Sequence, residues 1–307
     1  MISQRPDRRI TACIPYYRCK RYIRRAVLSL LAQTHRDLTV VVVNDGDPDP
    51  PWPMLRDITD PRLVRCNLAN NRGPYFITAA VLDACNTPYL LIQDADDWSA
   101  PRRVERLLGA LERDRSDFSV SAAPQFIEHG KGQRIVEIRW RSASHEADAG
   151  NFVIHHRITP AFKYRAPHHG LFRSASLRAI GGYYGGLKIN YDTLVPNLIL
   201  MIGRISHVPE GLYYRLLRPE SLTHGKLTGV GSAEAKRESA FQRLLYKSCF
   251  ASYRQFLDGE ITSSQLAASI RTNCAAGVSA ADRQILAVET RRISAAVRNQ
   301  TRQVRAS

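Results

Sequence analysis

The feature that most constrains the fold is an alternation of short apolar runs with helical patterns through the first 122 residues. Leu38–Val43 is apolar except at Thr39 and rich in β-branched residues, which is typical of a strand buried on both faces. Tyr89–Gln93 and Phe118–Ala122 are further strand candidates. Between such runs lie segments such as 20–33, whose apolar residues recur with the 3.6-residue period of a helix. This alternation predicts an α/β fold with a mostly parallel central sheet flanked by helices.

The later part of the chain has a different pattern, which suggests a domain boundary. After residue 231 the sequence is helical in pattern and poor in strand signals, with 12 Lys and Arg against 6 Asp and Glu, a net charge of +6. We therefore predict one folded domain over residues 1–231 and a basic, helical C-terminal appendage over 232–307. Two local predictions follow from the pattern. Ser99 should cap a helix that continues to about Arg113, and residues 141–165 should form a loop.

The formal net charge of +16 favours partners that carry phosphate. Nucleic acid, anionic lipid and a diphosphate substrate all satisfy this condition, and charge alone does not choose between them. The apolar runs are too short to span a bilayer, and no apolar segment of a signal peptide follows the charged N-terminus. None of the six cysteines forms a C-x-x-C pair, so we expect buried free thiols in a reducing cytoplasm.

Polar residues follow three of the predicted strands, and in an open parallel sheet the carboxyl ends of the strands define the binding edge. These segments are Pro15-Tyr16-Tyr17, Asn44-Asp45-Gly46 and Asp94-Ala95-Asp96-Asp97. The glycine-rich fingerprint of dinucleotide-binding folds is absent after the first strand, which argues against a Rossmann NAD site.

The run Asp94-Ala95-Asp96-Asp97 is the strongest chemical signal in the sequence. Three carboxylates after a buried strand repel one another and lose hydration unless a cation joins them. Mg²⁺ and Mn²⁺ prefer oxygen ligands and often bind one or two carboxylates together with substrate phosphates. The alternative is a helix start, in which Asp97 or Ser99 caps the helix and its dipole favours the acids.

Three weaker signals each have a simple structural alternative. Asp45 can accept a hydrogen bond from a base, or it can be the polar residue of an Asx turn. Tyr16 or Tyr17 can stack on a base, or it can pack inside the protein. The segment Asn70–Gly73 can line a nucleotide pocket, or it can be a plain loop.

Taken together, the order and spacing of these motifs resemble the family 2 glycosyltransferases with the GT-A fold. The resemblance rests on Ile14–Tyr17, Ser29–Thr34, Val41–Gly46, Asn71–Gly73 and Asp94–Trp98, and it continues in Leu171–Arg173, Ile180–Gly182, Val208–Glu210 and Tyr213–Arg215. It covers roughly residues 9–224. It implies an inverting glycosyltransferase that uses a nucleotide-diphosphate sugar, with a nucleotide-binding half at about 9–123 and an acceptor half at about 124–231.

The resemblance also implies roles for individual residues. Those implied to bind the donor nucleotide are Pro15, Tyr16, Tyr17, Asp45, Asn71, Arg72, Gly73, Asp94 and Ala95. Asp96 would ligate Mn²⁺ or Mg²⁺ at the diphosphate, with Asp97 and His224 as further candidate ligands. The candidates for acceptor contact are His168, His169 and Tyr191, and those for neutralising diphosphate charge are Arg215 and Arg218.

Asp192 matches the general base of the family. In direct displacement at the anomeric carbon, the metal stabilises the departing diphosphate, and one carboxylate suffices to take the proton from the acceptor hydroxyl. The simple alternative for Asp192 is a helix cap. The sequence departs from the family pattern at two positions: Asn44 replaces one of two common acids, and Tyr191 replaces the glutamate that often precedes the base.

The resemblance favours UDP as the nucleotide and leaves a glycan, a lipid-linked intermediate and a small natural product open as acceptors. One alternative is a nucleotidyltransferase that makes sugar nucleotides, but residues 15–25 lack the glycine-rich loop that holds a triphosphate. Another is a nucleic-acid-binding or membrane-binding protein without catalysis; no nucleic-acid motif occurs, so we expect no nucleic acid partner. The basic C-terminal helices can dock on an anionic membrane or a second protomer, so we expect a cytoplasmic enzyme, free or peripheral at the inner face of the membrane.

Overall fold

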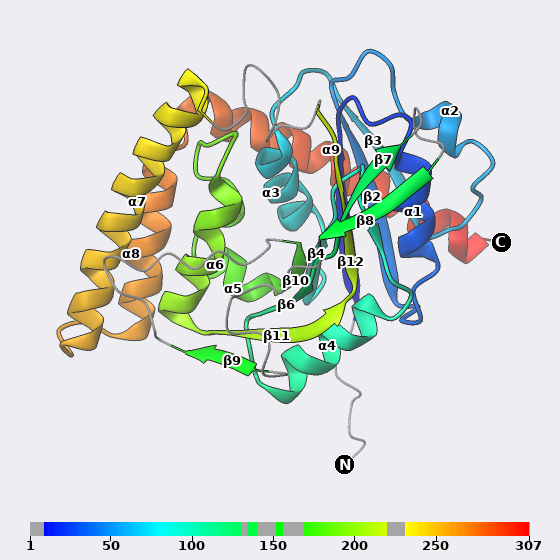
Figure 1. Ribbon diagram of the computed structural model, residues 1–307. Coiled ribbons are helices and arrows are strands. Elements are labelled where there is room, and N and C mark those ends of the chain that lie inside the picture. The colour runs from blue at the N-terminus through cyan, green and yellow to red at the C-terminus, as the bar shows by residue number, and fades with distance from the viewer. Residues whose placement is uncertain (1–8, 130–133, 140–151, 156–168, 220–230, 307) are drawn as a thin grey trace.

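The computed structural model describes residues 9–129, 134–139, 152–155, 169–219 and 231–306. The centre of the fold is an eight-stranded sheet with helices on both faces (Figure 1). The strand order across this sheet is β3 (Leu63–Leu68), β2 (Leu38–Asp45), β1 (Ile10–Tyr16), β4 (Tyr89–Ile92), β10 (Gly170–Arg173), β6 (Phe118–Ala122), β11 (Arg204–Gly211) and β9 (Phe152–His155). This architecture confirms the predicted α/β fold with a mainly parallel central sheet.

Strand β2 shows why the middle of the sheet is apolar. Every residue of β2 except Thr39 is buried, and the strand pairs in parallel with β1 on one side and β3 on the other. Strand β4 pairs in parallel with the free side of β1. Beyond β4, β10 runs antiparallel between β4 and β6, and β6 then pairs in parallel with β11. The carboxyl ends of β1, β2 and β4 therefore lie along one edge of the sheet.

Six helices precede residue 219 in the described part of the chain. They are α1 (Ile23–Leu31), α2 (Trp52–Leu55), α3 (Pro74–Ala84), α4 (Arg103–Arg113), α5 (Ser174–Ala179) and α6 (Tyr191–Ile202). Helices α1, α2 and α4 share a buried cluster with Ala12 and Val40, whereas α3, α5 and α6 share another with Cys13 and Val41. Successive strand residues point to opposite faces, so these two clusters lie on the two faces of the sheet.

A second, four-stranded sheet lies beside the end of β4. Its strand order is β5 (Trp98–Ser99), β12 (Tyr213–Leu217), β7 (Gln125–His129) and β8 (Arg134–Arg139). Strand β5 follows the acidic run directly and pairs antiparallel with Tyr213 and Tyr214 of β12. The second sheet therefore places β12 next to the acidic run.

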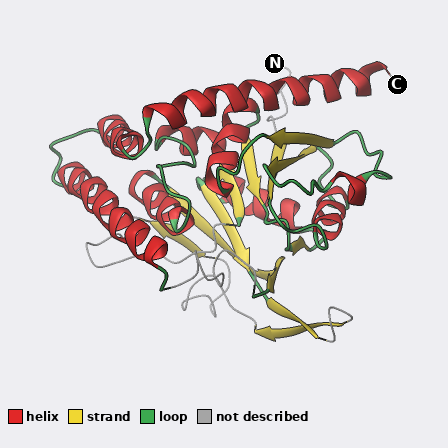
Figure 2. Ribbon diagram, turned by 90° about the horizontal axis from the view of Figure 1, so that it is seen from above, coloured by secondary structure: helices red, strands yellow, loops and turns green. Residues whose placement is uncertain are grey.

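Three C-terminal helices, α7 (Ala233–Leu257), α8 (Ser263–Ala276) and α9 (Ala280–Ala306), complete the described fold. Figure 2 shows α9 as the long helix that crosses the molecule to the C-terminus, and α9 contacts both α3 and β3. Buried residues of these helices, such as Cys249, Ile270 and Ile293, belong to the same cluster as α3 and α6. The helical character is confirmed. The domain boundary after residue 231 stays a prediction, and the helices beyond it share a hydrophobic core with the sheet.

Two local predictions were wrong. Ser99 does not cap a helix, because it belongs to β5 and α4 begins at Arg103. Its hydroxyl instead contacts the side chains of Gln93 and Arg103. Phe152–His155 forms β9 within the segment that was predicted to be a loop, because it pairs antiparallel with β11 at the edge of the sheet.

All six cysteines lie in the described residues and are buried and free, as predicted. Burial raises the pKa of the Cys66 thiol to about 12 and that of the Cys85 thiol to about 11, so both stay protonated at neutral pH. Among the described residues, no helix combines the length and the apolar composition that a membrane span requires.

We expect Gly170→Ala to destabilise the protein. A Cβ at this position of β10 would lie 2.3 Å from the Phe118 ring and 2.3 Å from the Ser119 carbonyl oxygen. Overpacking of this kind should lower the free energy of unfolding by about 1–3 kcal/mol, measured by urea denaturation. The matched control is Gly109→Ala in α4, where a Cβ meets no described atom within 4 Å. This variant should raise the free energy of unfolding by about 0.5–1 kcal/mol, because alanine is a better helix former than glycine. Equal midpoints for the two variants would contradict the tight packing of β10 on β6.

Candidate active site

The three polar segments predicted from the sequence meet at one edge of the sheet. Strands β1, β2 and β4 are parallel neighbours, and Tyr17, Asp45 and Asp94 stand at or just after their carboxyl ends. The register pairs Tyr16 of β1 with Asn44 of β2, so the ends of these strands are level. Ligands of open parallel sheets bind at such an edge.

Asp45 is buried, and both of its carboxylate oxygens accept hydrogen bonds from the loop that precedes α3. Oδ1 accepts the Arg72 N–H at 2.7 Å and Oδ2 accepts the Gly73 N–H at 2.9 Å. Burial raises the pKa of Asp45, although these two amides oppose the rise. Gly73 adopts φ 90°, a left-handed value that favours glycine. Asp45 therefore fixes the predicted nucleotide loop, and its contact with a base stays a prediction.

The two tyrosines after β1 divide into a core residue and a surface residue. Tyr16 is fully buried, and its hydroxyl donates to the Asp49 carbonyl at 3.1 Å. A ring enclosed in this way cannot stack on a base, which corrects the prediction for Tyr16. Tyr17 and Pro15 are partly exposed, and the Arg18 guanidinium lies 5.1 Å from the centre of the Tyr17 ring. Tyr17 is therefore the ring of this pair that is open to stacking.

The first two aspartates of the acidic run have different partners. The Asp94 side chain is 39% exposed, and its Oδ2 lies 2.7 Å from His169 Nε2. Asp96 Oδ2 accepts a hydrogen bond from Arg218 Nε at 2.5 Å, and the two side chains are 13% and 12% exposed. Ala95 between them is buried. Arg218 thus neutralises Asp96, and the role of Asp96 as a metal ligand stays a prediction.

Asp97 is the most deeply buried of the three aspartates, at 3% exposed. Its Oδ1 accepts the Leu216 N–H at 2.8 Å, and Tyr213 also hydrogen-bonds to it. Burial raises the pKa of Asp97 well above the ordinary value of an aspartate, and the charges of the other two aspartates add to the rise. Arg215 opposes this shift without reversing it. A cation beside Asp97 would therefore relieve an unfavourable buried charge.

Asp94, Asp97 and His169 form a group that fits a divalent cation. One ligand atom from each side chain lies within 4.8 Å of the others. Two carboxylate oxygens and an imidazole nitrogen are suitable ligands for Mn²⁺, and the crowded negative charge gives a cation an electrostatic reason to bind. Of the three predicted ligands, Asp97 belongs to this group, Asp96 pairs with arginine, and His224 lies outside the described residues.

His169 occupies a different place from the one predicted. It is 1% exposed, and its ring stacks on Tyr213 with the centroids 4.4 Å apart. An acceptor cannot reach a ring enclosed in this way, so the predicted acceptor contact is corrected to a contact with Asp94. His168, the other predicted histidine, lies outside the described residues.

A buried arginine holds the elements around the acidic run together. The Arg103 guanidinium donates to the Ile92 carbonyl at 3.1 Å, the His169 carbonyl at 2.9 Å, Gln93 Oε1 at 3.2 Å and Ser99 Oγ at 2.9 Å. Burial lowers its pKa to about 10, so it stays charged at neutral pH. Arg103 is not among the site residues predicted from the sequence. The sequence did contain one indication that Arg103 is buried. It lies four residues before Leu107, and this spacing places both side chains on the buried face of α4.

Asp192 lies in the first turn of α6 and is partly exposed. The Tyr75 hydroxyl hydrogen-bonds to Asp192; burial, and then the charge of Asp192, raise the pKa of Tyr75 well above its ordinary value. Burial lowers the pKa of Arg215, but the charges of Asp97, Tyr213, Asp94 and Asp192 together raise it above its ordinary value. Arg215 therefore interacts with both the acidic run and the predicted base.

Tyr191 is part of the core, so the prediction that it contacts the acceptor is wrong. The side chain is fully buried, and its ring centroid lies 5.9 Å from that of Tyr75 and 6.1 Å from that of Tyr183. A Cβ at Gly185 would lie 2.6 Å from the Tyr191 ring. Neighbouring residues on a helix point about 100° apart, which is why this ring is buried while Asp192 stays partly exposed.

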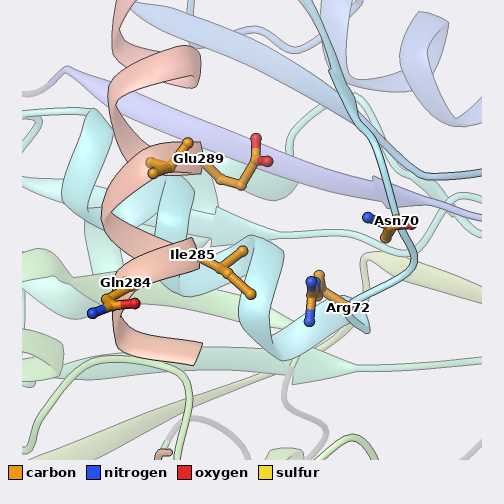
Figure 3. A pocket seen from close by; sticks show the side chains of 6 residues that line it. Asn70, Arg72, Gln284, Ile285 and Glu289 are labelled. Carbon is orange, nitrogen blue, oxygen red and sulfur yellow. The ribbon is translucent and has the colours of Figure 1, made fainter. Parts of the chain in front are cut away.

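A cavity of about 280 Å³ lies between the predicted nucleotide loop and α9. Its lining consists of Asn70 and Arg72 from the loop and Gln284, Ile285, Val288 and Glu289 from α9. Figure 3 shows the loop residues and the helix residues on opposite sides of this space. The side chain of Arg72 also pairs with Asp282 of α9 at 3.8 Å, whereas Asn71 is exposed. The C-terminal helix therefore borders the loop that Asp45 fixes.

The motif order and this fold agree with one sequence family. The sequence model described as Glycosyl transferase family 2 matches residues 11–181, which is more than half of the chain. The chain belongs to glycosyl transferase family 2. The match ends before α6, so Asp192 and the C-terminal helices lie beyond the segment that defines the family.

Individual family 2 relatives are distant. The chain is 24% identical to the chondroitin synthase of Escherichia coli over 237 residues, which are 76% of this chain and 32% of that protein. It is 23% identical over 112 residues, 36% of this chain and 45% of that protein, to an Escherichia coli UDP-Glc:alpha-D-GlcNAc-diphosphoundecaprenol beta-1,3-glucosyltransferase. The chain thus spans less than half the length of either relative.

A solved structure shares the fold over nearly the whole chain. The structure of S. aureus TarS 1-349 in complex with UDP-GlcNAc is 16% identical with a TM-score of 0.55, covering 97% of this chain and 92% of that one. The coverage includes the C-terminal helices, so TarS 1-349 has a similar arrangement beyond the family segment. This likeness confirms the predicted GT-A type of fold.

We expect Asp97→Asn to stabilise the protein in the presence of EDTA. The asparagine oxygen can still accept the Leu216 N–H, while the buried charge is removed. Because the pKa of Asp97 is higher in the folded than in the unfolded protein, the wild type loses stability as the pH rises above the ordinary aspartate range. The Tm of the variant should exceed that of the wild type by about 2–4 °C at about pH 8, and the difference should shrink as the pH falls.

Asp57→Asn is the matched control, since Asp57 is exposed and the Arg24 side chain that hydrogen-bonds to it lowers its pKa. This variant should show no gain in Tm at any pH. Thermal unfolding across a pH series measures both variants. A lower Tm for Asp97→Asn than for the wild type at every pH would contradict an unfavourable charge at this position.

Proposed function

We propose that this chain is an inverting glycosyltransferase that moves a sugar from a UDP-sugar to a hydroxyl group of its acceptor. The observation that carries the proposal is the acidic run at the strand edge, with Asp192 linked to it through Arg215. Membership of glycosyl transferase family 2 supports the reaction class. A shared fold with a protein that binds UDP-GlcNAc, and a relative named for its use of UDP-Glc, support the donor.

The donor nucleotide would lie between Tyr17 and the loop that Asp45 fixes. The partly exposed Tyr17 ring offers a surface for stacking, and the loop offers the exposed amide of Asn71. Asp94 would face the ribose or the diphosphate. A divalent cation, Mn²⁺ or Mg²⁺, held by the group of Asp94, Asp97 and His169, with Asp96 as a further ligand in place of its pairing with Arg218, would neutralise the charge that develops on the departing diphosphate.

Asp192 would take the proton from the acceptor hydroxyl as that hydroxyl attacks the anomeric carbon. The charge of Arg215 interacts with this carboxylate, and the Tyr75 hydroxyl hydrogen-bonds to it. No proton donor is required on the opposite side, since a diphosphate leaves as an anion. One carboxylate base is therefore sufficient for the reaction.

The acceptor hydroxyl would belong to a carbohydrate, a lipid-linked glycan or a small natural product. Chondroitin synthase, a polysaccharide-forming relative by name, supports a glycan, and the relative named for a diphosphoundecaprenol substrate supports a lipid-linked one. A nucleotidyltransferase is disfavoured because the chain belongs to a glycosyltransferase family and the segment after β1 contains no glycine through residue 25.

Two substitutions test the base and the metal ligand separately. Asp192→Asn should lower sugar transfer about 10²–10⁴-fold while the thermal shift produced by UDP and Mn²⁺ stays as in the wild type. Asp96→Ala should lose the Mn²⁺-dependent part of that shift. Asp258→Asn, at the exposed end of α7, should behave as the wild type in both assays. Near wild-type turnover in Asp192→Asn would refute the assigned base, and a retained Mn²⁺ effect in Asp96→Ala would refute the assigned ligand.

We propose further that the enzyme acts in the cytoplasm, peripheral at the inner face of the membrane, and that α7 supplies the contact. The exposed face of α7 contains five cations, which are Lys236, Arg237, Arg243, Lys247 and Arg254. Leu244, 64% exposed, lies among them. Basic residues beside an exposed aliphatic side chain suit an anionic lipid surface, whereas two copies of this face would repel each other. Six buried free cysteines also fit a reducing compartment.

Flotation of the full-length protein with vesicles tests this contact. We expect binding to phosphatidylglycerol vesicles, little binding to phosphatidylcholine vesicles, and at least a tenfold loss of binding in Arg243→Glu/Lys247→Glu, since each cation contributes about 1 kcal/mol. The matched control is Arg36→Glu/Arg56→Glu, which reverses two exposed cations elsewhere. Equal flotation of the two double variants, or binding that DNA abolishes at low concentration, would contradict a lipid partner for α7.

A further inference from the structure

The buried face of α7 holds the loop that leads to Asp192. The Glu238 carboxylate is 9% exposed and accepts hydrogen bonds from the backbone N–H groups of Lys188, at 2.9 Å, and Ile189. One turn further along α7, Gln242 is 2% exposed. Its Nε2 donates to the Asn190 carbonyl at 2.7 Å and contacts Thr193 Oγ1. Four polar contacts therefore join α7 to the residues just before and after Asp192.

These contacts add to a local bond at the start of α6, where the Thr193 hydroxyl donates to the Asn190 carbonyl at 2.9 Å. Within the described part of the chain, the N-cap residue Asn190 makes no side-chain capping bond, and it adopts φ 64°, in the left-handed region. The Asn190 side chain donates instead to Ser239 Oγ of α7 at 3.0 Å. The first turn of α6, which contains Asp192, is thus held by α7 as well as by its own local bond.

The same loop reaches the donor side of the site. A Cβ at Gly73 would lie 3.7 Å from Lys188 Cγ, so the Lys188 side chain packs against the predicted nucleotide loop. The charge of Lys188 also acts to lower the pKa of Asp45. On the other side of Asp192, the Tyr75 hydroxyl that bonds to it belongs to α3, which begins directly after Gly73. A shift of the loop would therefore change the distance between the base and the donor.

We propose that Glu238 and Gln242 are positioning residues for proton transfer at Asp192, an inference that rests on the proposed role of Asp192 as the general base. Hydrogen bonds from two amides to one carboxylate are charge-assisted and directional, so they fix the loop more closely than packing alone. A displacement of about 1 Å at a reacting group can reduce a rate about a hundredfold. Both residues lie outside the segment 11–181 that defines the family, so α7 adds this function from beyond it.

Kinetics of two nearly isosteric variants test the proposal in the full-length protein. Glu238→Gln removes the charge that holds two amides, and Gln242→Leu removes the amide donor while it keeps much of the volume. Each should lower kcat about 10- to 100-fold, with the KM for the UDP-sugar within about twofold and an unchanged thermal shift with UDP. Glu234→Gln on the same helix removes an exposed ion pair with Arg237 and should leave kcat unchanged.

Combination with Asp192→Asn separates positioning from a general structural effect. If Glu238 acts through Asp192, Glu238→Gln should lower the residual rate of Asp192→Asn by less than about twofold, because the group it positions is already gone. A full additional loss would overturn the proposal, and so would a wild-type kcat in Glu238→Gln and Gln242→Leu. If Asp192→Asn itself keeps wild-type turnover, the proposed base is wrong. If only the positioning role is wrong, Asp192→Asn is inactive while Glu238→Gln and Gln242→Leu keep wild-type activity, so the two failures can be told apart.

Discussion

The buried guanidinium of Arg103 fixes the strands around the acidic run, on which the rest of the site depends. It donates to the Ile92 carbonyl at the end of β4 and to the His169 carbonyl just before β10, two strands that run in opposite directions. It also contacts Ser99 of β5, and its centre lies 4.4 Å from the ring of Tyr213 in β12. A buried cation is stable only when such acceptors and an aromatic face replace its hydration. The position of the acidic run therefore depends on the acceptors that the buried charge of Arg103 requires around it.

The site concentrates charge in a way that reduces stability and serves binding. Three aspartates in four residues are partly or fully buried, and burial is the main reason that the pKa values of Asp96 and Asp97 are raised. Arg215 and Arg218 offset part of this cost without removing it. A bound metal–diphosphate complex would place a cation beside the aspartates and an anion beside the arginines, so both sets of charges would be neutralised together. The pairing of Arg218 with Asp96 also means that a metal at Asp96 has to compete with a guanidinium.

The sequence revealed most of the sheet and the residues at its edge, because buried parallel strands are continuous apolar runs and their ends must carry the polar groups. It did not reveal β10 between β4 and β6, since four residues carry no signal for strand order. It misplaced Tyr16, Tyr191 and His169, because a polar ring beside a site looks the same in sequence whether it points inward or outward. Glu238 escaped notice because a glutamate on a basic helix is normally exposed, and only tertiary contact explains its burial.

The packing of α9 on α3 and β3 has a consequence for synthesis on the ribosome. Domains are generally made from the N-terminus onward, and α3 and β3 precede α9 by most of the chain. Until Ile293 and its neighbours emerge, the apolar surface that they cover stays open to water or to other chains. The N-terminal part of the sheet is therefore synthesised long before its last packing partner is available. Exposed apolar surface of this kind is prone to aggregation, so this part of the nascent chain would gain from chaperone protection.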